Sequence, residues 1–343
     1  MPGKFIGFII GWLSITAGAS AQQNGDSKLT AGQIIQRAID SSGGDIKLDA
    51  IHSAEYISRI VTAGGDTLSF AVKRKDFNKY YISSLSLGYV NTTKIYNNGR
   101  AVQIKDEVAQ SITDARLLEE LLLQCYISID YGYKKLGYKL NRLDDQKFEN
   151  FDCFVVMAES PLGSKTLNFY DKKTGHNIMT IYPSQNKAVF IDFYQAKGIT
   201  IASRVLMVDT KDKITESVLE HVNYDNSLDT NWFTIPESGS CKAPEIFKTG
   251  IFRYINSDDG SIITREKDGQ VEMINGAMTA YKITWTGNSD YLLYRLKNPS
   301  APPADENIEF IKARITAWKG NKYYCHYITL GNVGGTCAFE KME

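Results

Sequence analysis

The histidines and cysteines are the residues of this sequence best suited to catalysis or metal binding, and their spacing favours neither. No two histidines share the short spacing of a metal-binding helix or loop. Cys325 and His326 are adjacent, but neighbours on a strand point to opposite faces, so they do not predict a catalytic pair. The sequence therefore predicts no enzyme, no catalytic residue, no metal site and no cofactor.

The cysteines raise a second question, that of disulfides. There are five: Cys125, Cys153, Cys241, Cys325 and Cys337. Cys325 and Cys337 flank the glycine-rich segment 330–335, so a hairpin would place them face to face as a candidate disulfide. Cys241 is an alternative partner for either residue, and buried free thiols are the other interpretation. An odd number leaves at least one thiol unpaired or bonded elsewhere.

The amino terminus has the pattern of a cleavable signal peptide. Lys4 precedes an apolar run over 5–15, and Ala19-Ser20-Ala21 provides small residues for cleavage. The run is shorter than the ~20 apolar residues that a membrane-spanning helix needs. Residue 22 is Gln, so the lipidated cysteine of a bacterial lipoprotein is missing. We expect residues 1–21 to be removed after Ala21, leaving a soluble, exported protein that does not span the membrane.

Composition points to a β-rich protein with no affinity for nucleic acid. The chain contains 20 Tyr and 15 Phe, residues that favour strands. The 39 Lys and Arg balance the 39 Asp and Glu, so no strong field would attract a polyanion.

Helix and strand signals alternate along the first two thirds of the chain. Thr30 and Gln33 form a capping box ahead of apolar residues at helical spacing, and Gly43-Gly44 ends that helix. Leu68, Phe70 and Val72 alternate with smaller or polar residues, as in a strand with one buried face. A leucine-rich stretch from Ser111 to Tyr126, capped by Thr113 or Ser111, predicts an amphipathic helix between strands.

The segment 237–244 is the best domain boundary, because it is small, polar and bracketed by prolines. We expect a first domain over 28–236 and a second, antiparallel β-domain over 245–343. The loop from Asn298 to Ala304, rich in proline, fits no sheet interior.

The order of these elements resembles the lipoprotein-sorting superfamily typified by LolA and LolB, over about 33–236. The residues that carry the resemblance are the helix Ile34–Asp40 with Gly43-Gly44, then Phe169–Gly175, then Val222–Tyr224 and Trp232–Pro236. The resemblance implies an α+β, mainly β fold, in which a curved antiparallel half-barrel carries a helical lid. The appended region resembles small uncharacterised β-rich envelope proteins, and we expect a lipocalin-like barrel there.

The resemblance also implies a function outside the cytoplasm, in a bacterial periplasm: holding the acyl chains of a lipid or lipoprotein. The expected apolar cavity residues are Leu68, Phe70, Val72, Tyr81, Phe169, Val189, Ile191 and Phe193, with Leu118, Leu121 and Leu122 from the lid. The same alternation would occur in a barrel packed shut by its helices. The alternative is therefore an envelope protein-interaction module that holds no ligand and binds another envelope protein.

Overall fold

A computed structural model describes residues 29–61, 67–86, 92–224, 227–237, 239–255, 261–296, 310–331 and 333–343. The expected signal peptide and the loop Asn298–Ala304 lie outside these residues. Within them, the strands form one 14-stranded antiparallel sheet and one closed barrel of eight strands. The fold class predicted from the sequence is confirmed.

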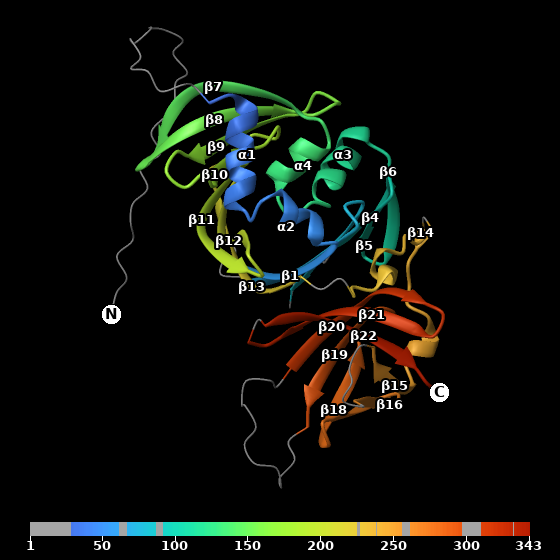
Figure 1. Ribbon diagram of the computed structural model, residues 1–343. Coiled ribbons are helices and arrows are strands. Elements are labelled where there is room, and N and C mark those ends of the chain that lie inside the picture. Colours follow the sequence, from blue (N-terminus) through green and yellow to red (C-terminus); the bar gives the residue numbers. More distant parts are fainter. Residues whose placement is uncertain are drawn as a thin grey trace, which may run out of the picture.

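The large sheet curves around the helices like an incomplete barrel (Figure 1). Its spatial order is β14-β6-β5-β4-β3-β2-β1-β13-β12-β11-β10-β9-β8-β7, so β1 and β13 close the middle of the sheet while β7 and β14 form its edges. Its strands are β1 (Ser53–Val61), β2 (Thr67–Lys75), β3 (Lys79–Ser86), β4 (Thr92–Asn97), β5 (Arg100–Lys105), β6 (Val108–Ile112), β7 (Lys139–Phe148), β8 (Phe151–Glu159), β9 (Lys165–Asp171), β10 (Asn177–Ile181), β11 (Lys187–Ala196), β12 (Ile199–Val208), β13 (Ile214–Asn223) and β14 (Gly239–Ser240).

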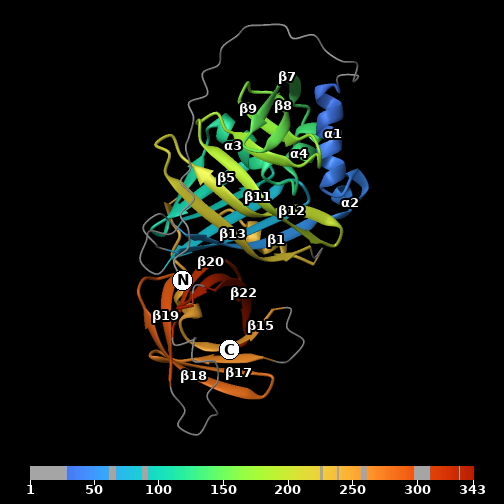
Figure 2. The same ribbon diagram turned by 90° about the vertical axis from the view of Figure 1, so that its left-hand side faces the viewer.

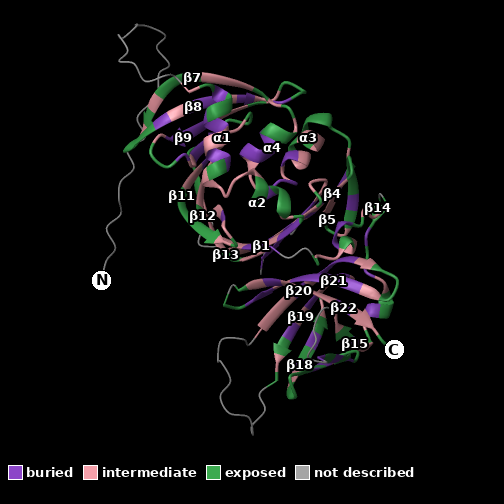
Figure 3. Cartoon of the chain, in the orientation of Figure 1, coloured by how far each residue is buried: buried purple, intermediate pink, exposed green. Residues whose placement is uncertain are grey.

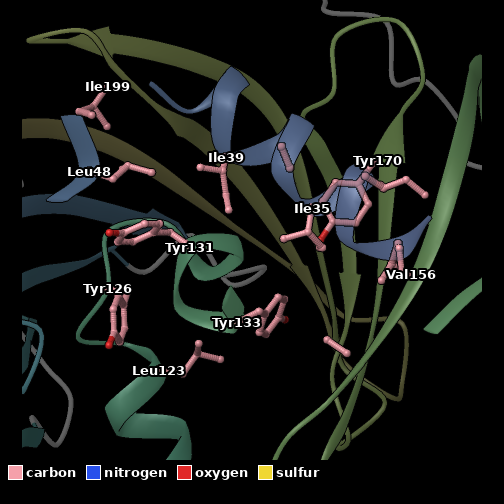
Figure 4. Packing of buried hydrophobic residues seen from close by; sticks show 14 of the residues in the cluster. Ile35, Ile39, Leu48, Leu123, Tyr126, Tyr131, Tyr133, Val156, Tyr170 and Ile199 are labelled. Atoms are coloured by element: carbon pink, nitrogen blue, oxygen red, sulfur yellow. The ribbon is translucent and has the colours of Figure 1, made fainter. Parts of the chain in front are cut away.

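The concave face of the sheet is filled from one end by helices (Figures 1 and 2). They are α1 (Ala31–Ser41), α2 (Asp45–Ala50), α3 (Ala115–Leu123) and α4 (Ile129–Lys135). The capping box of Thr30 and Gln33 is present at the start of α1, as predicted. Figure 4 shows α1 presenting Ile35 and Ile39 towards Tyr131 and Tyr133 of α4, in one continuous buried cluster.

Two details of this helical region differ from the sequence prediction. The predicted helix from Ser111 begins later, because Ser111 still belongs to β6 and Asp114 is the cap, accepting hydrogen bonds from the amides of 116 and 117. Helix α4 was not predicted. It is short, and Gly132 faces α3 so closely that a Cβ would lie 2.6 Å from Leu123 Cδ1.

The C-terminal strands close into a compact barrel. They are β15 (Gly250–Tyr254), β16 (Ile262–Arg265), β17 (Gly269–Ile274), β18 (Ala277–Trp285), β19 (Asp290–Arg295), β20 (Phe310–Lys319), β21 (Lys322–Thr329) and β22 (Gly334–Lys341). Arg265 fills the barrel interior with an exposure of only 2%, donating hydrogen bonds to Gln270 Oε1 at 2.8 Å and to the hydroxyl of Tyr323 at 3.1 Å. The interior of the barrel is therefore filled by the buried guanidinium group of Arg265, which aromatic rings surround.

The barrel packs against the convex face of the sheet (Figures 1 and 2). Figure 3 shows buried positions along β21 of the barrel and β1 of the sheet. The short 3-10 helices η1 (Thr230–Phe233) and η2 (Glu245–Phe247) lie between the last long strand of the sheet and the first strand of the barrel. Trp232 of η1 contacts Tyr81 and Tyr324 edge-on, which joins sheet and barrel through one aromatic cluster.

Candidate apolar binding site

Strand β2 divides its side chains between two buried environments. Val72 is opposite Tyr56 of β1 and packs with it in the cluster beneath the helices, so it faces the concave side. Because side chains alternate along a strand, Phe70 and Leu68 lie on that same side. Ser69 and Lys73, on the other side, face the barrel.

Helix α3 covers part of this concave face. Leu118, Leu121 and Leu122 are partly buried and pack with Val72 against Tyr80 and other residues of the sheet. The amphipathic pattern of α3 explains the contact, since its leucines share one helical face. The structure therefore brings four of the sequence-predicted site residues together.

Beyond the helices, the concave face stays apolar but is less completely covered. Ile60 of β1 pairs with Leu68 of β2 on one side and with Ser217 of β13 on the other. Ser217 pairs in turn with Val205 of β12, and Val205 pairs with Phe190 of β11. All five are partly exposed. We call Ile60, Leu68, Phe70, Phe190 and Val205 the inner strip. Three of its members, Ile60, Phe190 and Val205, were not in the predicted set, although the register of the strands places them beside Leu68.

Tyr81 does not belong with these residues. It is paired with Lys73 and therefore lies on the convex face, fully buried against Trp232 at the junction with the barrel. The prediction that Tyr81 shares a cavity with Phe70 is corrected by this register.

Phe169 and Val189 also face away from the helices. Tyr170 packs into the helical cluster, so its neighbour Phe169 points to the opposite side, where it joins Met179 and Val189 in a separate buried cluster. Phe169 and Val189 were predicted to line the cavity, but they belong to this separate cluster, which we call the outer-wall cluster.

Ile191 and Phe193 are surface residues of β11, with exposures of 39% and 37%. They follow Val189 at intervals of two residues and so lie on the same outer side of the strand, where Phe193 stacks on His176 with ring centroids 4.4 Å apart. Neither residue reaches the inner strip.

The four helices on the concave face, which we call the helical plug, hold a buried carboxyl group that was not predicted from the sequence. Asp130 of α4 is 6% exposed and accepts a hydrogen bond of 2.6 Å from the hydroxyl of Tyr170. Burial raises the pKa of Asp130 to about 6, an effect that the Tyr170 hydrogen bond opposes. Among the described residues, however, no group of three or more histidine, cysteine or acidic residues has a geometry that would hold a metal ion.

A second site lies on the convex side, at the junction. A cavity of about 240 Å³ is bordered by Glu55 and Lys73 of the sheet, Trp232 of η1, and Thr336 and Cys337 of the barrel. Lys73 is 1% exposed; it donates to the hydroxyl of Thr336 at 2.9 Å, forms an ion pair with Glu55, and lies 4.1 Å from the centroid of the Trp232 ring.

The pKa values of this ion pair reflect its burial. Burial lowers the pKa of Lys73 even though Glu55 favours its charged form. Burial opposes ionisation of Glu55, but Lys73 and the Thr336 hydroxyl together leave the pKa of Glu55 lowered. Each group thus favours the charged form of the other, and the two are held against each other in an ion pair.

The fold defines a class: a curved antiparallel sheet around a helical plug, followed by a separate closed barrel. No family model and no curated protein matches the sequence. Solved structures match through the fold. A LolA superfamily protein from Nitrosomonas europaea is 13% identical, with a TM-score of 0.43 over 60% of this chain and 98% of that chain. A DUF1329 family protein from Desulfovibrio piger is 13% identical, with a TM-score of 0.42 over 59% and 95%.

A further match spans both parts of the chain. MucB of Pseudomonas aeruginosa, solved in complex with MucA, is 9% identical, with a TM-score of 0.23 over 90% of this chain and 92% of that chain. No helix of the described residues is long and apolar enough to cross a membrane.

Proposed function

We propose that this protein is a non-enzymatic binding protein of the bacterial periplasm that holds the acyl chain of a lipid or lipoprotein on the inner strip. The observation that carries the proposal is the cross-strand row from Leu68 through Ile60 and Val205 to Phe190, which is mainly apolar and partly exposed on a concave face. Such a surface gains stability when a hydrocarbon chain covers it.

The energy available is adequate for a lipid ligand. Each methylene group that leaves water contributes about 0.8 kcal/mol, so a chain that buried six of them would gain about 5 kcal/mol before the cost of ordering it. A charged group in the same place would lose hydration without a partner. The inner strip should therefore prefer acyl chains to polar ligands.

Residues 1–21 support the location. Their charged end, apolar run and small residues before position 22 have the order of an exported leader, and Gln22 leaves no cysteine for a lipid anchor.

Native mass spectrometry of protein purified from a periplasm tests the proposal, followed by solvent extraction and lipid analysis. We expect a stoichiometric acyl species that Phe70→Asp removes. Phe193→Asp is the matched control, because it makes the same change on the outer face. Protein that is free of lipid and takes up no added fatty acid or phospholipid would overturn the proposal.

A second candidate function, docking of an envelope protein, is favoured by the outer face of the barrel. Ile262, Met273 and Met278 lie side by side across three strands and are 37%, 50% and 67% exposed. Flexible methionines suit adaptable protein contacts. A photo-reactive residue at 278 should then give one discrete adduct in periplasm, which Met273→Asp abolishes; the absence of any adduct would exclude this candidate.

A further inference from the structure

Two cysteines of the barrel lie directly opposite each other. Cys325 of β21 and Cys337 of β22 are cross-strand partners, as the sequence predicted for a hairpin. Both are free thiols in the structure. Cys325 has no exposed surface within the barrel core, and Cys337 packs against that same core.

The next pair along these strands holds the barrel to the sheet. His326 and Thr336 are cross-strand partners on the opposite face of the hairpin. The His326 ring lies 3.1 Å from Ser69 Oγ through Nε2 and 3.2 Å from Ser83 Oγ through Nδ1. The Thr336 hydroxyl contacts both Lys73 and Glu55. Each thiol is therefore one residue away from a side chain that anchors the junction.

We propose that Cys325 and Cys337 are a disulfide site, and that this bond fixes the spacing of the two strands that carry His326 and Thr336. The inference is independent of the proposed ligand. Rotation or separation of β21 and β22 would move both anchors, so a covalent link between the strands stabilises the junction together with the barrel.

The chemistry is thiol–disulfide exchange with a small or protein disulfide of an oxidising compartment. One cysteine thiolate attacks a sulfur of that disulfide, which releases a thiol and leaves a mixed disulfide. The other cysteine then attacks its neighbour's sulfur and releases the second thiol. The pair gives up two electrons and two protons, and the incoming disulfide is reduced to two thiols.

The surroundings of Cys337 set the timing of this reaction. Burial, and then the hydrogen bond with Cys325, raise the pKa of Cys337 well above that of an ordinary thiol, so little thiolate is available once the barrel has formed. We therefore expect fast oxidation during folding and slow oxidation of the folded, reduced protein.

The other three cysteines provide controls. Cys125 packs beneath α3, Cys153 belongs to the outer-wall cluster, and the amide of Cys241 donates to the Glu107 carbonyl beside the sheet edge. None of them is a cross-strand partner of Cys325 or Cys337.

The first test counts thiols. The chain over 22–343 is refolded in an oxidising glutathione buffer, alkylated in guanidinium chloride and digested. We expect three alkylated cysteines and one linked peptide pair that contains Cys325 and Cys337. Five alkylated cysteines, or a link that involves Cys241, would overturn the proposal.

The second test measures the junction. Trp232 lies in the cluster between sheet and barrel, so in a protein that carries Trp285→Phe and Trp318→Phe its fluorescence follows loss of that contact. We expect the oxidised protein to lose the Trp232 signal at a temperature several degrees above the reduced protein. Cys337→Ser should abolish this difference, whereas Cys241→Ser should retain it. Equal midpoints for oxidised and reduced wild-type protein would show that no such clamp exists.

Discussion

Gly334 of the barrel lies directly on Ser69 of the sheet. A Cβ at position 334 would be 1.7 Å from Ser69 Oγ and 2.6 Å from Ser69 Cβ, closer than atoms can approach. The absence of a side chain at Gly334 therefore allows β22 to approach β2, which in turn lets His326 reach Ser69.

Gly334→Ala should consequently destabilise the junction, by about 1–3 kcal/mol as for other overpacked contacts. Urea unfolding followed by Trp232 fluorescence measures the change. Gly269→Ala is the control, because its nearest neighbour would be an ordinary 3.8 Å away. Ser69→Gly should restore part of the stability of the Gly334→Ala protein; equal effects of the two alanine substitutions would contradict this packing.

The second prediction concerns acid. Burial, reinforced by the charge of Lys73, lowers the pKa of His326 from 6.5 to about 3. The unfolded chain therefore binds a proton that the folded protein rejects, and the stability contributed by neutral His326 is lost as pH falls from 6.5 towards 3.

We expect this histidine to contribute up to about 1.4 kcal/mol of lost stability per pH unit in that window. Denaturant titrations at pH 7, 5.5 and 4.5 measure the slope. His326→Gln keeps a polar group between Ser69 and Ser83 but cannot titrate, so it should reduce the slope. An unchanged slope would assign the acid sensitivity to other groups.

Asp130 should behave in the opposite sense. Because burial raises its pKa from 3.8 to about 6, the folded protein binds a proton that the unfolded chain has lost. Its contribution is fully present below pH 3.8 and disappears as pH rises through 6.

Asp130→Asn should therefore raise the free energy of unfolding at pH 7, by up to about 3 kcal/mol, and have little effect at pH 4. The amide oxygen can still accept the hydrogen bond from the Tyr170 hydroxyl. Chemical denaturation at the two pH values tests this. A loss of stability at pH 7 would mean that the ionised carboxylate is stabilising.

Local signals predicted local structure well. The capping box at Thr30 and the opposition of Cys325 and Cys337 were both readable, since each depends on residues close in sequence. The separation of Cys325 from His326 onto two faces was predicted for the same reason. Helix α4 was missed because it is short and is stabilised by tertiary packing, which periodicity does not report.

The cavity residues were harder to assign, because the sheet is covered on both faces. The barrel buries the convex side of β3, so apolar or aromatic residues follow one another at Tyr80, Tyr81 and Ile82. Alternation therefore does not show which of them faces inward. On β11, Val189, Ile191 and Phe193 share one face, but Phe190 on the other face is also large and apolar, so alternation alone does not show which face points inward. Only Leu68, Phe70 and Val72, where the alternating residues are small or polar, gave an unambiguous pattern.

The last prediction concerns the buried ion pair. Lys73 is 1% exposed and Glu55 21%, so the pair is shielded from solvent and neither charge is well hydrated alone. Lys73→Met should leave Glu55 without its cation and destabilise the protein by about 3–5 kcal/mol. Glu55→Gln in the same protein should recover much of this loss, because a neutral amide needs no counter-charge.

Lys134→Met, at a surface ion pair whose side chains are 45% and 34% exposed, is the matched control and should cost less than about 1 kcal/mol. Urea unfolding of the four proteins at pH 7 decides the matter: if the double variant is no more stable than Lys73→Met alone, the loss comes from the lysine's packing on Trp232 and not from its charge.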